Sequence, residues 1–279
     1  LFFFDPIAPA SPFFLPNGTI ILSELEKYVK DLYKLYDYKE VITPQIFNTE
    51  LWKRSGHYEN YLENMFFVSI DEKEFGVKPM NCPAAALVYA SEIHSYRDLP
   101  LRLADFGRLH RNERSGVTHG LTRVRSFSQD DAHIFCKFDQ IEAEIAKFLN
   151  MLNESYKTFK FDNIRFELSL RPEKRVGDDN TWNESEKILK NILDKNKYKY
   201  SMQSGEGAFY GPKIDAFVPD AIGREWQLGT VQLDFSLPER FDLEYVEEDG
   251  SRQKPVVIHR AMLGSLERFL GVLIEHLSG

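Results

Sequence analysis

Cysteine is scarce in this sequence: Cys82 and Cys136 are the only two among 279 residues. Two cysteines exclude a disulfide-stabilised scaffold and suit a reducing compartment, so we expect a cytoplasmic protein. Long apolar runs are missing as well. The longest, residues 84–90, falls far short of the ~20 residues that a membrane span needs, and the first residues lack the pattern of a signal peptide. We therefore expect no membrane partner.

Positive charge is in deficit, because 35 Lys and Arg stand against 43 Asp and Glu and give a net charge of −8. This acidity argues against sequence-independent coating of nucleic acid, although it does not exclude a local basic patch. Aromatic residues make up 14% of the chain, which is enough core-forming material to exclude disorder as the main state. The length suits one large domain or two small ones.

Helical and strand periodicities alternate irregularly along the chain. Helices are predicted over 23–36, with Ser23 and Glu26 as a capping box, over 139–156, opened by Asp139, from a cap at Thr181 onward, and over 263–277. Strict alternation of apolar and polar residues predicts strands over 164–170, 231–235 and 241–245. Such alternation favours an α+β fold with a large antiparallel sheet flanked by helices over a doubly wound parallel sheet. Residues 171–204 are predicted to be an insertion with its own helix.

Residues 101–127 are the most unusual segment. Six arginines stand there against two acids, which is about +4 on an acidic chain: Arg102, Arg108, Arg111, Arg114, Arg123 and Arg125. Guanidinium groups bind phosphate oxygens in a bidentate fork that lysine does not reproduce, so one interpretation is a polyphosphate site on a loop between two strands. The other is a solvated strand–loop–strand whose arginines pair with surface acids. Composition alone slightly favours the second.

One cysteine and two histidines, Cys82, His133 and His259, supply the ligand types of a catalytic zinc site with one open position. Their separations of 51 residues (133 − 82) and 126 residues (259 − 133) are unlike a compact zinc finger. On spacing alone, a small buried thiol and ordinary core histidines are the better interpretation.

Two further segments carry weaker signals. Residues 205–213 contain a GxGxxxG spacing, but a strand is predicted to follow it, whereas a dinucleotide-binding loop must open a helix. A ligand-approaching loop and a plain hairpin turn both remain open. Glu267 and Arg268, beside the apolar stripe of the last helix, are by pattern solvated charges. No GxSxG nucleophile elbow is present.

Several of these segments together resemble one known family. The residues 106–113 and 120–135 are similar to motif 2 of class II aminoacyl-tRNA synthetases, and in particular of the threonyl-tRNA synthetase family; residues 80–83, 205–215, 229–235 and 259–271 fit the same family. The resemblance covers all 279 residues and implies a single catalytic domain over 1–279, with the editing and anticodon-binding domains absent. It also implies a piece excised from a longer protein.

The resemblance implies that this chain activates L-threonine with ATP and Mg²⁺ and transfers it to the 3′ end of threonine tRNA. Arg111 is expected at the α-phosphate, Arg268 and Arg123 at the γ-phosphate, and Lys213 near the carboxylate or α-phosphate. Glu113 is expected at the adenine amino group and Phe127 against the base. Gln227 and Gln232 are expected to line the same cleft.

The resemblance also assigns the amino-acid site. Asp131, Gln129, Tyr210 and Met80 are expected to hold threonine, and Cys82, His133 and His259 to hold one Zn²⁺. A site that ligates the substrate hydroxyl rejects valine by ~10⁴–10⁵, whereas serine loses only a methyl group, worth roughly 1–3 kcal/mol. His57 is a candidate proton relay in the transfer step. Pro44 matches a dimer-interface proline, so a homodimer is expected.

Two alternatives stay open. One is a synthetase of the same fold for serine or proline, against which the three zinc-type residues argue. The other is a non-catalytic paralogue that acts as a regulator or tRNA-binding module. Such a paralogue would be expected to lose Arg111, Arg268 or a zinc ligand, and all are present.

Overall fold

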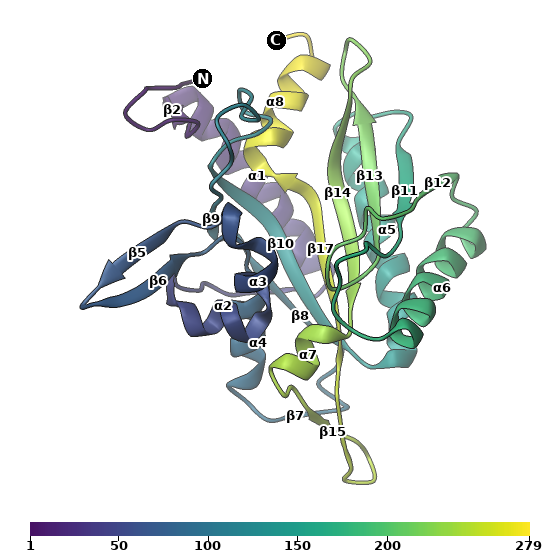
Figure 1. Cartoon of the computed structure of the whole chain (residues 1–279). Helices are drawn as coiled ribbons and strands as arrows, with labels where there is room; N and C mark the ends of the chain where they lie inside the picture. The colour runs from purple at the N-terminus through teal and green to yellow at the C-terminus, as the bar shows by residue number, and fades with distance from the viewer. The chain divides into compact units, whose positions relative to one another are not determined.

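The computed structural model describes all residues 1–279 and is built around a nine-stranded sheet (Figure 1). The strand order is β12-β11-β13-β14-β17-β10-β8-β3, and β9 pairs with β10 off this path. The bounds are β3 (Lys39–Glu40), β8 (Leu101–Asp105), β9 (Arg108–His110), β10 (Ser126–Cys136), β11 (Arg165–Ser169), β12 (Tyr200–Gln203), β13 (Lys213–Pro219), β14 (Glu225–Asp234) and β17 (Val256–Ser265). β11–β13, β13–β14, β14–β17 and β9–β10 pair antiparallel, and β11–β12 pair parallel. The predicted α+β class is confirmed.

The chain forms two compact units. Unit 1 comprises Leu1–Ala84, Ala104–Asp131 and Leu263–Gly279, and unit 2 comprises Ala85–Leu103 and Ala132–Met262. Strands β8, β10 and β17 contribute residues to both. None of the helices is long and apolar enough to cross a membrane.

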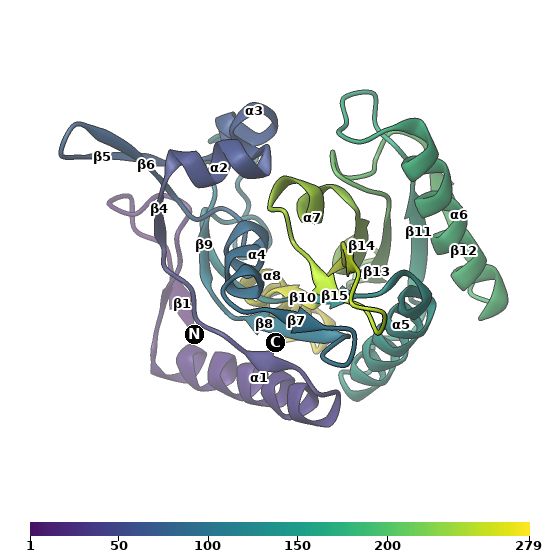
Figure 2. The ribbon, with the colours of Figure 1, turned by 90° about the horizontal axis from the view of Figure 1, so that it is seen from below.

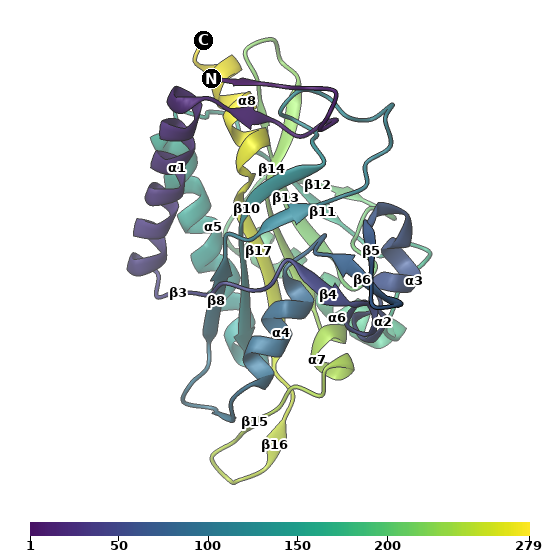
Figure 3. The same cartoon turned by 90° about the vertical axis from the view of Figure 1, so that its left-hand side faces the viewer.

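Unit 1 holds the hairpin β1 (Phe2–Phe3) and β2 (Phe13–Phe14), and a small sheet of β4 (Ile46–Asn48), β6 (Lys73–Val77) and β5 (Phe67–Ile70). Its helices are α1 (Pro16–Leu35), α2 (Thr49–Ser55), α3 (His57–Tyr61), the 3₁₀ turn η1 (Leu62–Asn64) and α8 (Leu266–His276), while α4 (Cys82–Ala90) begins there. Helices α1 and α8 are in contact (Figure 3).

Two predicted helix boundaries in unit 1 are wrong. Helix α1 begins at Pro16, so Ser23 lies inside it, because the locked φ of proline suits the first helical position. Helix α8 begins at Leu266, where Ser265 caps it by accepting from the Arg268 amide at 3.1 Å. Leu263 instead belongs to β17, where it is buried, and its apolar side chain resembled the first position of the helical stripe.

Unit 2 contains α5 (Ile141–Thr158) after the 3₁₀ turn η2 (Phe138–Gln140), α6 (Asp179–Lys195) and α7 (Ser236–Arg240). Figure 2 shows α5 and α6 beside β11. The Tyr156 hydroxyl of α5 donates to the Met262 carbonyl at 2.8 Å. Gly229 in β14 has no room for a side chain, since a Cβ there would lie 2.4 Å from Leu152. The helix predicted over 139–156 is present, but Asp139 lies in the 3₁₀ turn η2 and α5 begins at Ile141.

Two local predictions in unit 2 are also wrong. Helix α6 is capped by Asp178, whose carboxylate accepts from the Asn180 and Thr181 amides, so Thr181 is not the cap. The predicted strand 241–245 is mostly absent. Helix α7 ends just before it, Asp242 has φ +48°, and only β15 (Tyr245–Val246) pairs, with β16 (Arg252–Gln253) and β7 (His94–Ser95). The segment 171–204 does carry its own helix, and its end forms β12 at the sheet edge.

Candidate active site

The arginine-rich segment forms the predicted strand–loop–strand. β9 and β10 pair antiparallel with Ser126 opposite His110 and Phe127 opposite Leu109. The Arg111 amide donates to the Arg125 carbonyl at 2.9 Å and closes the base of the loop. Phe127 is buried, so the loop rises from a rigid, apolar base.

Three guanidinium groups converge at this loop. The Arg111 guanidinium lies over the Phe127 ring at 5.0 Å and donates to the Pro79 carbonyl at 3.2 Å. Arg268 of α8 donates to the Thr122 carbonyl at 2.8 Å. Burial lowers the pKa of Arg268, and the positive charges of Arg111 and Arg123 lower it further. Guanidinium groups that lie this close repel one another, so the cluster is well suited to receive a polyanion.

The other arginines of the segment have structural partners. Arg102 forms a buried ion pair, Arg108 pairs with Glu267, Arg114 forms an exposed pair and Arg125 donates to a backbone carbonyl. The solvated interpretation therefore holds for Arg114, whereas Arg123 pairs with Glu113 through two bonds of 2.9 and 3.1 Å inside the cluster.

Glu267 is not the solvated charge that its position in the sequence indicates. It is 1% exposed and accepts from the Ser128 amide at 3.0 Å and from Arg108 at 2.7 Å. Burial raises the pKa of its carboxyl group. The side chain joins α8 to β9 and β10 within unit 1, and therefore holds Arg268 near the loop.

A second group in unit 1 surrounds the start of α4. Asp131 accepts from the Asn81 amide nitrogen at 3.0 Å. His57 is 1% exposed, with its Nδ1 2.9 Å from the Ser55 hydroxyl and its Nε2 3.2 Å from the Met80 sulfur. Gln129 lies in β10, two residues before Asp131.

Unit 2 brings together His133 of β10 and His259 of β17, whose ring centroids are 4.7 Å apart. His259 Nε2 lies 2.9 Å from an Asp234 carboxylate oxygen. This contact leaves the other ring nitrogen, Nδ1, to act as a metal ligand. Burial lowers the pKa of His133 well below its ordinary value, which favours the neutral form that binds metals. The Tyr210 ring stacks on His259 at 4.8 Å.

Cys82 of unit 1 is buried, and so are His133 and His259 of unit 2; each offers one potential ligand atom. One thiol and two imidazoles are ligands that zinc accepts, and a carboxylate on the far nitrogen of a ligating histidine is the usual outer contact. The residues present therefore fit a zinc ion. Spacing in the sequence favoured ordinary core histidines, because it carries no information on the 4.7 Å separation of the His133 and His259 rings.

Polar residues of β13 and β14 extend the unit 2 group. Lys213 lies 2.8 Å from Asp215, which accepts from the Gln227 amide at 2.6 Å. The Tyr210 hydroxyl donates to Gln232. Sequence reasoning missed Asp215 and Asp234, because an acid within an alternating strand gives no sign of what it faces.

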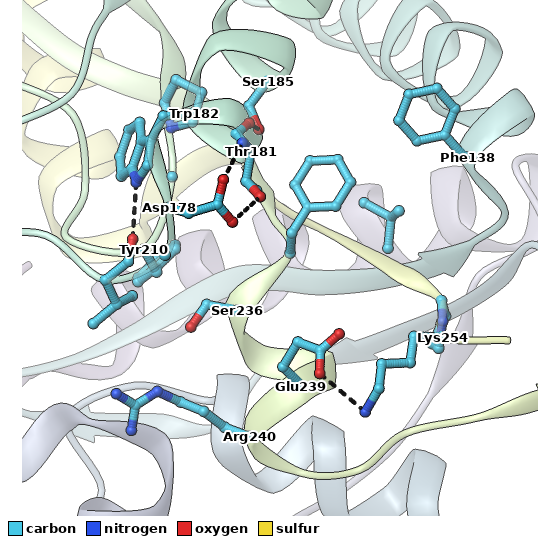
Figure 4. A pocket seen from close by; sticks show the side chains of 17 residues that line it. Phe138, Asp178, Thr181, Trp182, Ser185, Tyr210, Ser236, Glu239, Arg240 and Lys254 are labelled. Carbon is cyan, nitrogen blue, oxygen red and sulfur yellow. Dashed lines mark hydrogen bonds and ion pairs between the residues drawn. The ribbon is translucent and has the colours of Figure 1, made fainter.

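A cavity of about 580 Å³ lies in unit 2 (Figure 4). Asp178 and Trp182 line it from the start of α6, and the Glu239–Lys254 ion pair, at 3.2 Å, lies across from them. Of the predicted site residues only Tyr210 lines this cavity.

The comparisons with known proteins agree with this geometry. The model of the tRNA synthetase class II core domain (G, H, P, S and T) matches residues 66–277. The threonine–tRNA ligase of Bdellovibrio bacteriovorus is 52% identical over all 279 residues, which cover 42% of its length. That of Thermotoga maritima is 54% identical over 272 residues, 98% of this chain and 42% of the relative. The chain belongs to the threonyl-tRNA synthetase family. It spans less than half the length of these curated relatives.

Solved structures of the threonyl-tRNA synthetase family superpose closely. A crystal structure described as the RNA-binding domain of threonyl-tRNA synthetase from Cryptosporidium parvum is 48% identical, has a TM-score of 0.97, and matches all of this chain and 70% of its own. A prolyl-tRNA synthetase structure from Giardia lamblia is 16% identical with a TM-score of 0.67 and shows the fold alone.

Proposed function

We propose that this chain carries the catalytic centre of a threonine–tRNA ligase. The observation that carries the proposal is the convergence of Arg111, Arg123 and Arg268 beside the Phe127 ring. The threonine carboxylate attacks the α-phosphorus of ATP, the bond to the β-phosphate oxygen breaks, and pyrophosphate leaves. The tRNA 3′ hydroxyl then attacks the carbonyl and AMP leaves. Neither step needs a protein nucleophile, so the protein contributes positioning and charge stabilisation.

We propose the following roles, which the family implies and with which the contacts are compatible. Arg111 binds the α-phosphate and Phe127 stacks on the adenine base; Arg268 and Arg123 take the γ-phosphate, with Mg²⁺ bound to the nucleotide. Glu113 is oriented by its bonds from Arg123 and accepts from the adenine amino group. Lys213 offsets charge at the reacting carboxylate. Gln227 and Gln232 are proposed as further nucleotide-binding residues.

We propose that Cys82, His133 and His259 hold a zinc ion. Bound there, zinc would act as a Lewis acid for the amino and hydroxyl groups of threonine, which selects against valine. Asp131, Gln129, Tyr210 and Met80 complete the amino-acid site. His57 is a candidate to move a proton in the transfer step; it is buried, and its Nε2 lies 3.2 Å from the Met80 sulfur.

Three further expectations belong to this proposal. The protein is expected in the cytoplasm, with threonine tRNA as its macromolecular substrate. A homodimer is expected. Pro44 is exposed, as an interface residue of the unpaired chain would be. A synthetase for serine or proline is less well supported, since the threonine–tRNA ligases match at 52–54% and the prolyl-tRNA synthetase structures at 15–16%.

The test is amino-acid-dependent ATP–pyrophosphate exchange on zinc-loaded chain, with threonine, serine, valine and proline. Strong exchange with threonine, less with serine and almost none with valine is expected. Arg268→Ala should abolish exchange, whereas Arg114→Ala, which removes an exposed arginine paired only with Glu63, should not. Exchange with valine equal to threonine contradicts the zinc selection. No exchange with any amino acid on folded, zinc-bearing chain favours the non-catalytic paralogue.

A further inference from the structure

Asn81 is a buried amide whose two donor hydrogens are both used. Its Nδ2 donates to the Asp131 carboxylate at 3.0 Å and to the Asp105 backbone carbonyl at 3.3 Å. The side chain is 1% exposed. Its carbonyl oxygen, Oδ1, is buried and has no hydrogen-bond partner.

This pattern determines which way the amide faces. The two neighbours of Nδ2 are both acceptors, so exchanging nitrogen and oxygen would place three oxygens together without a hydrogen. The amide therefore faces Asp131 with its donor end. The bond to a carboxylate is charge-assisted, and it is the stronger of the two.

Asp105, whose backbone carbonyl accepts from Asn81, is itself held by a buried polar network. We call Thr43, Lys78 and Asp105 together the floor. The Thr43 hydroxyl donates to the Asp105 carboxylate at 2.7 Å, and the Lys78 ammonium lies 2.9 Å from Thr43 and 3.4 Å from Asp105. Lys78 is 0% exposed. Burial lowers the pKa of Lys78, while the charges of Asp105 and Asp131 oppose this shift.

The backbone at Gly107 packs directly against the side chains of this network. A Cβ on Gly107 would lie 2.4 Å from the Lys78 ammonium and 2.9 Å from Asn81 Oδ1. A side chain at this position would displace the ends of Lys78 and Asn81, so the two side chains pack directly against the Gly107 backbone. Asn81 consequently reaches Asp131 from a rigid support.

We propose that Asn81 is a positioning residue that orients the Asp131 carboxylate toward the substrate hydroxyl, with the Thr43–Lys78–Asp105 floor holding it in place. The inference rests on the proposed function, in which Asp131 receives that hydroxyl. A role in stability alone explains the arrangement less well. A buried acceptor without a partner costs free energy that an apolar side chain of similar size would avoid.

The test compares Asn81→Ala with the parent chain in pyrophosphate exchange. The KM for threonine and for serine should rise roughly tenfold to hundredfold, the range expected for losing a hydrogen bond to a charged group. The KM for ATP should not change. The inhibition constant of valine, measured as a competitor of threonine, should also stay constant, because valine has no hydroxyl for Asp131 to accept from.

Ser155→Ala is the matched control, since Ser155 is 0% exposed and donates to the Met151 carbonyl at 2.9 Å in unit 2. It should lower the melting temperature without changing any of these constants. Asn81→Ser, which keeps a polar atom in the buried space, is measured as well in case the alanine variant does not fold, and the same selective rise is expected.

Two results would overturn the inference alone: a threonine KM within twofold of the parent, or equal changes in the threonine KM and the valine inhibition constant. The second would mean that Asn81 only maintains the shape of the pocket. Failure of the proposed function is seen separately, as an absence of threonine-dependent exchange in the parent chain, and it would remove the basis of the inference too.

Discussion

Removing the negative charge of Glu144 should destabilise the chain strongly, because it leaves the Arg102 guanidinium buried without a counter-charge. The two side chains are each 8% exposed and form a bidentate pair, with Nε–Oε2 at 2.6 Å and Nη2–Oε1 at 2.7 Å. Breaking one partner of such a pair costs roughly 3–5 kcal/mol. At roughly 2–4 °C per kcal/mol for a domain of this size, Glu144→Gln should lower the melting temperature by roughly 6–20 °C.

The double variant Arg102→Met with Glu144→Leu should recover most of that loss. Two apolar side chains of similar volume need no counter-charge, so such replacements of a buried pair are often neutral or stabilising. Thermal and urea unfolding of the two single variants, the double variant and the parent form a complete double-mutant cycle.

The exposed pair of Arg114 and Glu63 is a matched control. Its N–O distance is 2.7 Å, similar to the buried pair, but its side chains are 81% and 80% exposed. Glu63→Gln should not change the unfolding midpoint measurably. Equal shifts for Glu63→Gln and Glu144→Gln, or a double variant as unstable as the sum of the singles, would refute the argument that burial sets the magnitude.

Three further outcomes are expected. Asp234→Asn should weaken zinc binding ~10–100-fold in a competitive metal-buffer titration, because the His259 Nε2 contact at 2.9 Å loses its charged partner; unaltered affinity would argue against zinc at this histidine. Gly211→Ala should prevent correct folding, since its Cβ would lie 1.8 Å from a backbone oxygen. Gly116→Ala is the control, because its Cβ would meet nothing within 4 Å. In urea unfolding it should be neutral or raise the free energy of unfolding by up to ~1 kcal/mol. Burial opposes ionisation of Asp220, but hydrogen bonds from Trp226 and Arg224 outweigh it and lower its pKa from 3.8 to about 2. The stability that Asp220 contributes is thus present above pH 3.8 and lost as the pH falls toward 2, and Asp220→Asn should flatten this part of the pH–stability profile; parallel profiles for both proteins would contradict it.

Helices and strands could be predicted where the apolar residues of a segment followed only one spacing, either that of a helix or that of a strand. Helix α5 and strand β11 appear where their apolar spacing predicts, because each buries one regular face. The boundary between β17 and α8 was not predictable in this way. Strand β17 is buried on both faces, so it shows no alternation of apolar and polar residues, and its last apolar residues merge with the stripe of the helix that follows.

For the site, the residue types and the order of the motifs were legible in the sequence, and they were sufficient to indicate the family and the segment rich in arginine. The sequence did not show which arginines lie together in the folded chain. Arg111 and Arg268 are 157 positions apart (268 − 111), and only the pairing of β9 with β10 and the position of α8 bring both to one loop. Their neighbours in the sequence, Arg114 and Glu267, have quite different surroundings.

The amino-acid sequence by itself determined the α+β class, the main helices and strands, the local excess of positive charge and the resemblance to class II synthetases, because each of these depends on neighbouring residues or on a linear motif. Only the tertiary structure decided which side chains lose their water and which partners replace it. Burial and proximity arise when distant segments pack, and this is why Asn81, Asp234 and Glu267 were recognised from the structure alone.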